Sequence, residues 1–402
     1  MSRGKIVRLG GIEPPLPVPK TGTLSVELQA LFFTLSGIIV SNMLTIDEQI
    51  EEIEAVLRKT PHHKATNGFI GAMRAKIARL RDKEIDIATK GGGAGGGGFT
   101  VKKQGDATIV LIGPPSAGKS TLINQLTNAE SKVAPYAFTT VTVVPGMLKY
   151  NEAYIQILDI PGLIEGAKEG KGRGREVLSV AKGADLLLIM TDVKRVSAFA
   201  GMVKELDGAG IRINEERPKV LIEKKTSGGL EIFSNFKQSI DKETIKEIAR
   251  EFGIKNGNIT INEKISQRRL FDAFSVNRVY VPAIFVINKV DMEPKYKSMI
   301  DGDFVAISAD KKMGVDTLIN EVWKALKFVT VYLVKPDKEP DLTDPIVMKS
   351  GETLKDVAVK IGSDFADSKK LVKIWGPDAK FPGQEVSFDT NVAEGMQIRF
   401  IN

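Results

Sequence analysis

The chain contains no cysteine and only two histidines among its 402 residues. The absence of cysteine excludes a disulfide framework and any metal site built from thiolates, and it suits the reducing environment of the cytoplasm. The histidines, His62 and His63, stand beside Pro61 between two helix-like stretches, so catalysis by histidine is not expected. No apolar run reaches the length of a membrane span, and we therefore predict no membrane partner.

The composition indicates a multidomain protein with a moderate excess of positive charge. Hydrophobic residues make up 42% of the chain, which supports sizeable cores. A chain of this length folds into about two to four domains. The net charge is +7, from 57 Lys and Arg against 50 Asp and Glu. This excess favours a phosphate-rich partner, so we expect the ribosome or a structured RNA.

A glycine-bounded loop joins a strand-like stretch, residues 107–112, to a helix-like stretch, residues 121–126. Its residues are Gly113, Pro114, Pro115, Ser116, Ala117, Gly118, Lys119 and Ser120, followed by Thr121. A strand, such a loop ending in Lys-Ser and a helix form the phosphate-binding P-loop. Backbone N–H groups of the loop surround phosphate oxygens, and the helix N-terminus adds positive potential. Lys119 is predicted to reach the β- and γ-phosphates, and Ser120 to ligate Mg²⁺.

A second motif, Asp159-Ile160-Pro161-Gly162, follows a strand-like stretch at residues 154–158. Alone, Asp-x-Pro-Gly is most simply a turn. Behind a P-loop, however, the acidic residue can hold Mg²⁺ through a water, and the glycine N–H can sense the γ-phosphate. The motif therefore predicts the switch that detects whether GTP or GDP is bound.

Two further motifs predict that the base is guanine. Asp291 can accept hydrogen bonds from the guanine N1–H and 2-amino group, a donor pair that adenine lacks. Asn288 and Lys289 are expected to brace the loop and cover the base, and Ser308-Ala309 to close over the guanine O6. We therefore predict GTP and GDP binding; Asp291 argues against an ATPase with a glutamate at this position.

One of two threonines in Phe138-Thr139-Thr140 is expected to ligate Mg²⁺ only when the γ-phosphate is present. We prefer Thr140 for this role. The alternative is that both threonines are β-branched residues that open a strand at residues 141–144.

Together these motifs resemble the DRG branch of the Obg-like GTPases, an archaeal and eukaryotic group. The resemblance covers about residues 45–402. Two features are specific to this branch: the long stretch that follows Asp159, and the motif Asn-Arg-Val-Tyr-x-Pro. Its carrying segments are Gly113–Ser120, Tyr136–Gly146, Asp159–Ala167, Lys171–Arg175, Asn277–Pro282 and Asn288–Asp291.

The resemblance implies an α/β P-loop GTPase domain, with a mostly parallel sheet flanked by helices. An N-terminal helical hairpin precedes this domain, a ribosomal-S5-domain-2-like α+β subdomain is inserted into it, and a β-grasp TGS domain follows it. The expected boundaries are 1–42 for an extension, 43–104 for the hairpin and a linker, 105–205 and 277–328 for the two parts of the G domain, 206–276 for the insertion, and 329–402 for the TGS domain.

The predicted hairpin consists of two stretches of helical spacing separated by Thr60-Pro61. The resemblance implies a helix-turn-helix element. Its second helix carries Arg74, Lys76, Arg79, Arg81 and Lys83. Such a run is usually a solvated face, but its density slightly favours contact with a phosphate backbone. Residues 91–98, seven glycines and one alanine, predict a flexible linker.

The insertion and the tail both show short strand and helix patterns. In the insertion we expect strands at 219–223, 230–233 and 258–261 and a helix at 241–252, with Lys224 and Lys225 at a hairpin tip before Ser227-Gly228-Gly229. In the tail we expect strands at 329–334, 371–375 and 397–401 and a helix at 353–361. TGS domains of this family have two histidines in the region of 381–391; this chain has none there, so their role in RNA binding does not carry over.

Residues 1–42 differ from the rest of the chain. Four prolines between Pro14 and Pro19 preclude regular structure. The apolar stretch 28–40 has the length of a signal-peptide core, but no A-x-A cleavage site follows it. We interpret these residues as translated upstream sequence, with Met43 as the start; a genuine extension is the alternative.

The expected reaction is slow, Mg²⁺-dependent hydrolysis of GTP that relies on Lys119, Thr140 and Gly162. Ras-like GTPases orient the attacking water with a glutamine directly after Asp-x-x-Gly, where this chain has Leu163. A monovalent cation such as K⁺, or a group from a protein cofactor, could take over the role of the absent glutamine. Ser116 stands where potassium-stimulated GTPases often have asparagine, which weakens the case for K⁺.

Two functional hypotheses remain open at this point. The first is a slow GTPase switch that acts on ribosomes or RNA. The second is a nucleotide-gated RNA- or ribosome-binding protein in which hydrolysis is incidental.

Overall fold

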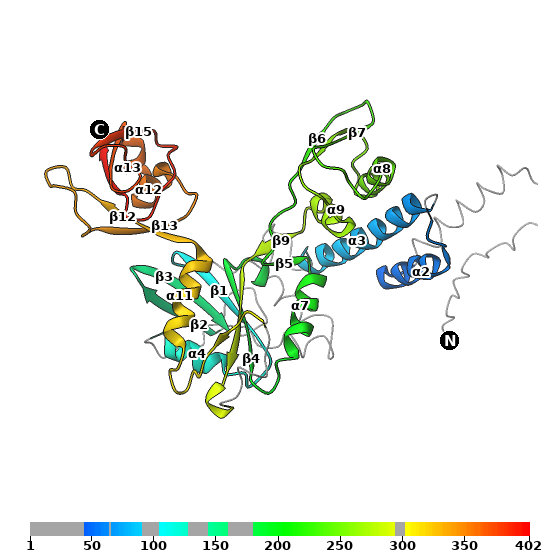
Figure 1. The fold of residues 1–402 in the computed structure, drawn as a ribbon, viewed down its shortest axis with the longest axis horizontal. Coiled ribbons are helices and arrows are strands. Elements are labelled where there is room, and N and C mark those ends of the chain that lie inside the picture. The colour runs from blue at the N-terminus through cyan, green and yellow to red at the C-terminus, as the bar shows by residue number, and fades with distance from the viewer. Residues whose placement is uncertain (1–43, 64–65, 91–103, 128–143, 160–179, 294–301) are drawn as a thin grey trace, which may run out of the picture. The chain divides into compact units, whose positions relative to one another are not determined.

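The computed structural model describes residues 44–63, 66–90, 104–127, 144–159, 180–293 and 302–402 (Figure 1). The chain divides into two units, Met1–Thr60 and Pro61–Asn402. In the described ranges no helix is both long enough and apolar enough to cross a membrane. Several predicted features lie outside the described residues: the 1–42 extension with Met43, the 91–98 linker, Phe138, Thr139, Thr140, Ile160, Pro161, Gly162 and Leu163.

The described part of the first unit is helix α2, Ile46–Lys59. Thr45 caps its N-terminus: the Thr45 side chain accepts from the Glu48 backbone N–H, and the Glu48 carboxylate accepts from the Thr45 N–H at 2.7 Å. This reciprocal pair is a capping box. The helix ends because Thr60 is extended, as expected for a residue that precedes proline. The helix predicted from the apolar spacing is confirmed.

The second unit contains a six-stranded sheet in the order β11-β10-β4-β1-β3-β2. Its strands are β1 (Ala107–Ile112), β2 (Val144–Tyr150), β3 (Ala153–Asp159), β4 (Leu186–Asp192), β10 (Ala283–Asn288) and β11 (Val305–Ala306). Neighbouring strands pair in parallel, except that β2 runs antiparallel to β3. Every residue of β1 and β4 is buried, as expected when helices cover both faces. The predicted mostly parallel α/β sheet is confirmed.

Among the described residues, three helices cover this sheet: α4 (Lys119–Leu126), α7 (Ala198–Gly208) and α11 (Val315–Leu326) (Figure 1). Ile109 and Leu111 of β1 share a core with α4 and α11, whereas Val110 and Ile112 share a core with α7. This alternation follows from the period of two along a strand. Because the strands are parallel, the loops after β1, β3, β4 and β10 meet at one edge.

The insertion is a three-stranded sheet with two helices. Its elements are β6 (Val220–Lys224), β7 (Leu230–Ser234), α8 (Lys242–Glu251), β8 (Gly257–Ile261) and α9 (Gln267–Phe274). The predicted hairpin between β6 and β7, with Lys224 and Lys225 at its tip, is wrong, because β8 lies between these strands. The connecting loop closes on Asn256 instead: the Lys225 N–H donates to the Asn256 carbonyl, and the Gly229 N–H donates to its side chain.

Helix α3, Asn67–Lys90, packs against α8 and α9 of the insertion. Ala75 is fully buried in the core of the insertion. Arg74 donates to Gln267 Oε1 at 3.1 Å, and Arg79 donates to the Glu251 carbonyl at 2.6 Å. Two of the basic side chains expected to favour a phosphate backbone, Arg74 and Arg79, thus also bind protein groups while they remain exposed.

The tail forms a five-stranded sheet in the order β13-β12-β16-β14-β15. Its elements are β12 (Phe328–Leu333), β13 (Pro345–Lys349), α12 (Leu354–Ile361), α13 (Ser363–Ser368), β14 (Leu371–Trp375), β15 (Gln384–Val386) and β16 (Gln397–Ile401). The first and last strands, β12 and β16, pair in parallel, and the other neighbours are antiparallel. Val331, Val372 and Ile398 are fully buried in its core. The three strands and the helix predicted here are confirmed; β13, β15 and α13 were not predicted.

A chain of buried charges joins α3, the insertion and the G domain. Arg278 of the Asn-Arg-Val-Tyr-x-Pro motif donates to Asp272 of α9 at 2.7 Å and to Asp82 of α3 at 2.5 Å. Arg212, in β5 (Ile211–Ile213), donates to both Asp272 oxygens at 2.7 Å. None of these four side chains is more than 10% exposed. Each charge is tolerated because it is paired and hydrogen-bonded.

Replacing Asp272 with alanine is expected to lower the free energy of unfolding by about 3–5 kcal/mol, because two arginines would lose a buried partner. Burial alone would raise the pKa of Asp272, but the hydrogen bonds from Arg212 and Arg278 lower it. Its stabilising effect is therefore present at neutral pH and lost as the pH falls below the ordinary aspartate range.

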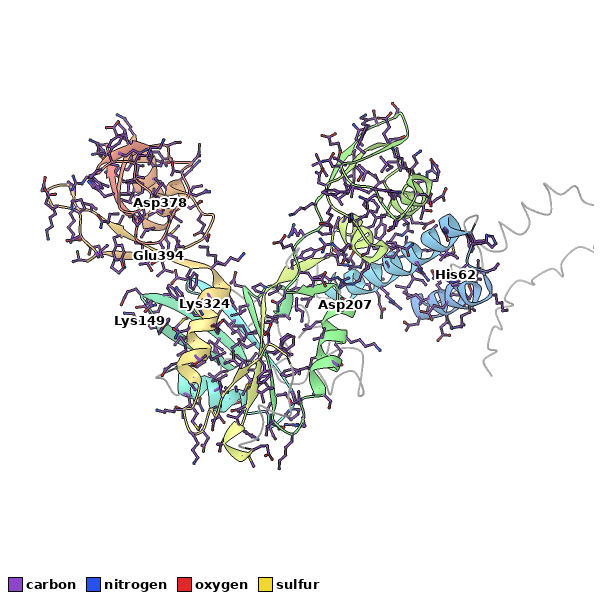
Figure 2. All side chains as sticks on the ribbon, in the orientation of Figure 1. His62, Lys149, Asp207, Lys324, Asp378 and Glu394 are labelled. Atoms are coloured by element: carbon purple, nitrogen blue, oxygen red, sulfur yellow. The ribbon has the colours of Figure 1, made fainter. Side chains whose placement is uncertain are left out.

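Urea unfolding followed by circular dichroism measures this change in stability. Asp378→Ala serves as the control, because Asp378 is an exposed aspartate (Figure 2) whose loss should change stability by less than about 0.5 kcal/mol. Equal stability of the Asp272→Ala and Asp378→Ala variants would show that the buried charges do not hold these parts together.

Candidate functional site

The P-loop turns from the end of β1 into the start of α4, and two of its glycines have no space for a side chain. A Cβ on Gly113 would overlap the Met190 carbonyl oxygen of β4, and a Cβ on Gly118 would overlap the Asn288 side-chain amide. Gly118 also has a φ of +93°, in the left-handed region that glycine adopts without strain. The glycines therefore let the loop lie directly against β4 and the loop after β10.

Lys119 opens α4 and is 7% exposed. Its Nζ donates to the carbonyls of Gly113 at 3.0 Å and Pro114 at 3.2 Å, and it lies 3.9 Å from Asp159 Oδ1. The ammonium group thus lies between the beginning of the P-loop and the end of β3. A P-loop lysine must point back along the loop in this way to reach bound phosphate oxygens.

Two of the predicted Mg²⁺ ligands lie together. Ser120 Oγ donates to Asp159 Oδ2 at 2.8 Å. The other carboxylate oxygen, Oδ1, is buried and has no hydrogen-bond partner among the described residues. A hydroxyl beside a carboxylate with a spare oxygen suits Mg²⁺, which prefers oxygen ligands. Ser120 and Asp159 therefore fit the predicted metal; the third expected ligand, Thr140, lies outside the described residues.

The loop after β10 is joined to the P-loop by two side chains. Asn288 Nδ2 donates to the Ala117 carbonyl, and Asn288 Oδ1 accepts from the Ala309 N–H, each at 2.9 Å. Lys289 has a φ of +61° and donates through Nζ to the Ser116 carbonyl at 2.7 Å. Asn288 and Lys289 thus contact the loop that the sequence predicts them to brace.

The residues expected to read the base occupy the turns after β10 and β11. Asp291 is exposed, in a single 3₁₀ turn, Val290–Met292. Ser308 is 1% exposed, and its backbone pairs with that of Met313 at 3.0 Å in both directions. Asp291 is thus free to meet a ligand, while the Ser308-Ala309 turn is fixed by its own backbone. Thr121 is exposed in the first turn of α4.

Sequence reasoning missed one pair at this edge of the sheet, Asp192 and Arg195. Asp192 ends β4 and is in register with Asn288 of β10. Arg195 donates to Asp192 Oδ2 through Nε at 3.0 Å and Nη2 at 2.6 Å, and Nη2 also donates to the Pro115 carbonyl at 2.9 Å. The only signal in the sequence was an aspartate at the end of an apolar strand.

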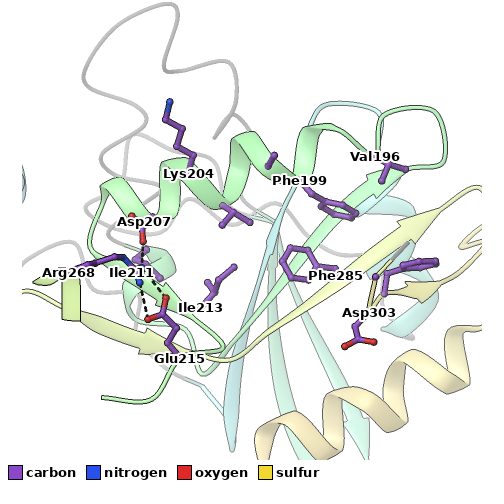
Figure 3. Close-up of a pocket in the computed structure, with 14 residues that line it drawn as sticks. Val196, Phe199, Lys204, Asp207, Ile211, Ile213, Glu215, Arg268, Phe285 and Asp303 are labelled. Carbon is purple, nitrogen blue, oxygen red and sulfur yellow. Dashed lines mark hydrogen bonds and ion pairs between the residues drawn. The ribbon is translucent and has the colours of Figure 1, made fainter. Parts of the chain in front are cut away.

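A separate groove of about 720 Å³ lies beside α7, β5 and β10 (Figure 3). Phe199 and Phe285 form part of its apolar wall and stack edge to face. At one end Arg268 contacts Asp207 at 2.5 Å and Glu215 at 2.9 Å. None of its lining residues belongs to a predicted nucleotide-binding motif, so the groove is distinct from the P-loop site.

The chain is similar to known GTPases along most of its length. Residues 108–225 match the family described as 50S ribosome-binding GTPase, residues 227–328 match the C-terminal region of that domain, and residues 329–402 match the TGS domain. An uncharacterized GTP-binding protein of Methanocaldococcus jannaschii is 42% identical over 366 residues, which cover 89% of this chain and 93% of the relative.

A eukaryotic relative and a solved structure complete the comparison. Developmentally-regulated GTP-binding protein 1 of Xenopus laevis is 39% identical over 350 residues, or 85% of this chain and 95% of its own. The structure of the Schizosaccharomyces pombe YchF GTPase aligns with 75% of this chain and 99% of its own at 13% identity, with a TM-score of 0.40; a score of this size does not establish a shared fold. The sequence matches do establish the family: the chain belongs to the developmentally regulated GTP-binding proteins, P-loop GTPases that carry a C-terminal TGS domain.

Proposed function

We propose that this protein is a slow, Mg²⁺-dependent GTPase whose bound nucleotide controls its association with the ribosome or with structured RNA. The single observation that carries the chemistry is the Ser120–Asp159 contact at 2.8 Å, with the Lys119 ammonium 3.9 Å from the same carboxylate. A hydroxyl and a carboxylate that can ligate Mg²⁺, beside a buried cation, are what phosphoryl transfer requires of a protein.

Each residue of the site has a defined task in this proposal. The P-loop N–H groups and Lys119 hold the phosphates in place, and Ser120 and Asp159 would hold Mg²⁺. When bound, Mg²⁺ supplies positive charge to the β- and γ-phosphate oxygens. Asp291 accepts hydrogen bonds from the guanine N1–H and 2-amino group, so the same site selects GTP and GDP over adenine nucleotides.

Slow turnover is proposed because Leu163 stands where a water-orienting glutamine would be expected. Thr140 and Gly162 are the proposed groups that respond to the γ-phosphate: Thr140 through Mg²⁺ and Gly162 through its backbone N–H. Both contacts would be lost once the γ-phosphate is hydrolysed and leaves. A monovalent cation such as K⁺, or a group from a protein cofactor, would supply the missing orientation of water.

A ribosomal or RNA partner is supported by two independent features. The family that matches residues 108–225 is described as ribosome-binding, and the chain carries a net charge of +7. Positive charge favours association with a phosphate-rich surface. A protein that acts on ribosomes would work in the cytoplasm, which is the location we propose.

Ribosome co-sedimentation tests this proposal. We expect a larger bound fraction with a non-hydrolysable GTP analogue than with GDP, because the γ-phosphate contacts reorganise the switch segments. The bound fraction should fall as salt rises, because counterions are released on association. In the Lys119→Ala control the bound fraction should no longer respond to nucleotide. Binding indifferent to both nucleotide and salt would refute the switch.

The alternative is a nucleotide-gated binding protein in which hydrolysis is incidental. Single-turnover phosphate release, measured with and without ribosomes and in KCl and NaCl, separates the two. A switch that uses hydrolysis in its cycle should release phosphate faster on ribosomes. An unchanged rate, together with nucleotide-dependent binding, would favour the alternative.

A further inference from the structure

Three successive carbonyl groups of the P-loop accept hydrogen bonds from side chains outside it. The Pro115 carbonyl accepts from Arg195 at 2.9 Å, the Ser116 carbonyl from Lys289 at 2.7 Å, and the Ala117 carbonyl from Asn288 at 2.9 Å. Lys289 and Asn288 belong to the guanine-recognition motif. Arg195 belongs to no motif and comes from the segment after β4.

The Pro115 carbonyl matters because of the two prolines before Ser116. Proline has no backbone N–H, so Pro114 and Pro115 cannot donate to a phosphate, and the Ser116 N–H is the first donor after Gly113. In a planar trans peptide the C=O and the following N–H point to opposite sides. A donor that holds the Pro115 carbonyl therefore also fixes the direction of the Ser116 N–H.

The conformation of Ser116 also needs support. Its φ is +61°, a left-handed value that costs a residue other than glycine about 1 kcal/mol or more. Such strain persists only where the surroundings hold it in place. Arg195 and Lys289 hold the carbonyls on the two sides of this residue.

Arg195 is itself fixed by Asp192. The guanidinium reaches Asp192 Oδ2 through two nitrogens, at 3.0 and 2.6 Å, and the Lys194 N–H donates to the other oxygen at 3.1 Å. Burial alone would raise the pKa of Asp192, but the Arg195 hydrogen bonds lower it, so the carboxylate stays charged at neutral pH. Thr191 Oγ1 also donates to the Arg195 carbonyl at 3.1 Å.

We propose that Arg195, oriented by Asp192, is a positioning residue for nucleotide binding. It holds the Pro115–Ser116 peptide so that the Ser116 N–H faces the bound phosphates. This role rests on the proposed nucleotide binding by the P-loop. Arg195, from the segment after β4, adds a hydrogen bond to the P-loop beside those that Asn288 and Lys289 donate from the end of β10. Because Arg195 acts through the loop, it should affect the diphosphate part of the ligand and not the guanine part.

The experiment compares Arg195→Ala with Lys194→Ala by displacement of a fluorescent GDP derivative with GDP and with GMP. Lys194 is the adjacent exposed lysine, so the control removes the same charge without touching the P-loop. A lost charge-assisted hydrogen bond should weaken GDP binding about tenfold. GMP has no β-phosphate for the loop to surround, so its affinity should change much less. The control should leave both affinities unchanged.

Two further variants separate positioning from folding. Arg195→Lys keeps one donor and should restore part of the GDP affinity; it replaces Arg195→Ala if that variant does not fold. Arg195→Ala should weaken GDP binding less in an Asp192→Asn background than in the native chain. The reason is that Asp192 acts on the P-loop through Arg195, so the two losses overlap. An equal loss of GDP and GMP affinity, or no loss of either, would overturn the proposal.

Discussion

A Lys119→Ala variant is expected to bind GTP and GDP about a hundredfold more weakly, or not measurably. The ammonium lies between the start of the P-loop and Asp159, 3.0 Å from the Gly113 carbonyl and 3.2 Å from the Pro114 carbonyl. In the presence of nucleotide it is positioned to exchange these carbonyls for phosphate oxygens. Loss of two charge-assisted hydrogen bonds to phosphate, at about 1.5 kcal/mol each, corresponds to this factor.

Isothermal titration calorimetry with GDP measures the effect. Lys119 is 7% exposed and donates to carbonyls of its own loop, those of Gly113 and Pro114, so we expect its removal not to unfold the domain; circular dichroism checks this. Lys324→Ala is a suitable control because Lys324 is an exposed lysine of α11 in the same domain (Figure 2). Native-like affinity in a folded Lys119→Ala variant would mean that the loop does not bind phosphate as assigned.

The sequence predicted the G domain well because its strands carry local signals. A fully buried parallel strand is a continuous apolar run, and β1 and β4 are of this kind. Three of the strands lead directly into a motif: β1 is followed by Gly113, β3 ends at Asp159 and β10 ends at Asn288, whereas the end of β4 at Asp192 carried no motif. Since the carboxyl ends of parallel strands share an edge, motifs spread over almost 200 positions could be expected at one site.

Strand order in the insertion could not be read in the same way. Ser227-Gly228-Gly229 correctly indicates a turn, but a turn does not say which strand lies beside which. The next strand, β8, occupies the place between β6 and β7, and this pairing depends on chain segments that are distant in sequence. Helix α9 did have a local signal that was overlooked: Ser266 caps its N-terminus by accepting from the Arg269 N–H.

The two arginine contacts were beyond sequence reasoning for a related reason. Arg278 meets Asp82 across 196 residues, and Arg195 meets Pro115 across 80. Neither pair has a fixed spacing in the sequence, and the Asn-Arg-Val-Tyr-x-Pro motif that contains Arg278 does not indicate its partner. Contacts of this kind depend on how strands and helices pack, so only the folded chain shows that Arg195 belongs to the P-loop site.

An Asp291→Asn variant is expected to change the preferred base from guanine to xanthine. In the function proposed above the carboxylate accepts from the guanine N1–H and 2-amino group, whereas an amide can donate to the 2-oxo group of xanthine. A buried polar group left without its partner costs about 1–3 kcal/mol. The variant should therefore bind GTP about ten- to a hundredfold more weakly, and XTP more tightly by a similar factor, than the native protein does.

The change should be confined to the base because the rest of the turn is held independently of Asp291. The Val290 N–H donates to the Ile307 carbonyl at 3.2 Å, and Lys289 remains bound to the Ser116 carbonyl at 2.7 Å. Competition of GTP and XTP against a fluorescent GDP derivative measures the ratio of affinities. Glu293→Gln removes a carboxylate two residues away and should leave that ratio unchanged. If Asp291→Asn still prefers GTP by the native factor, the carboxylate does not contact the base, and the guanine specificity of this chain must come from the backbone around Ala309.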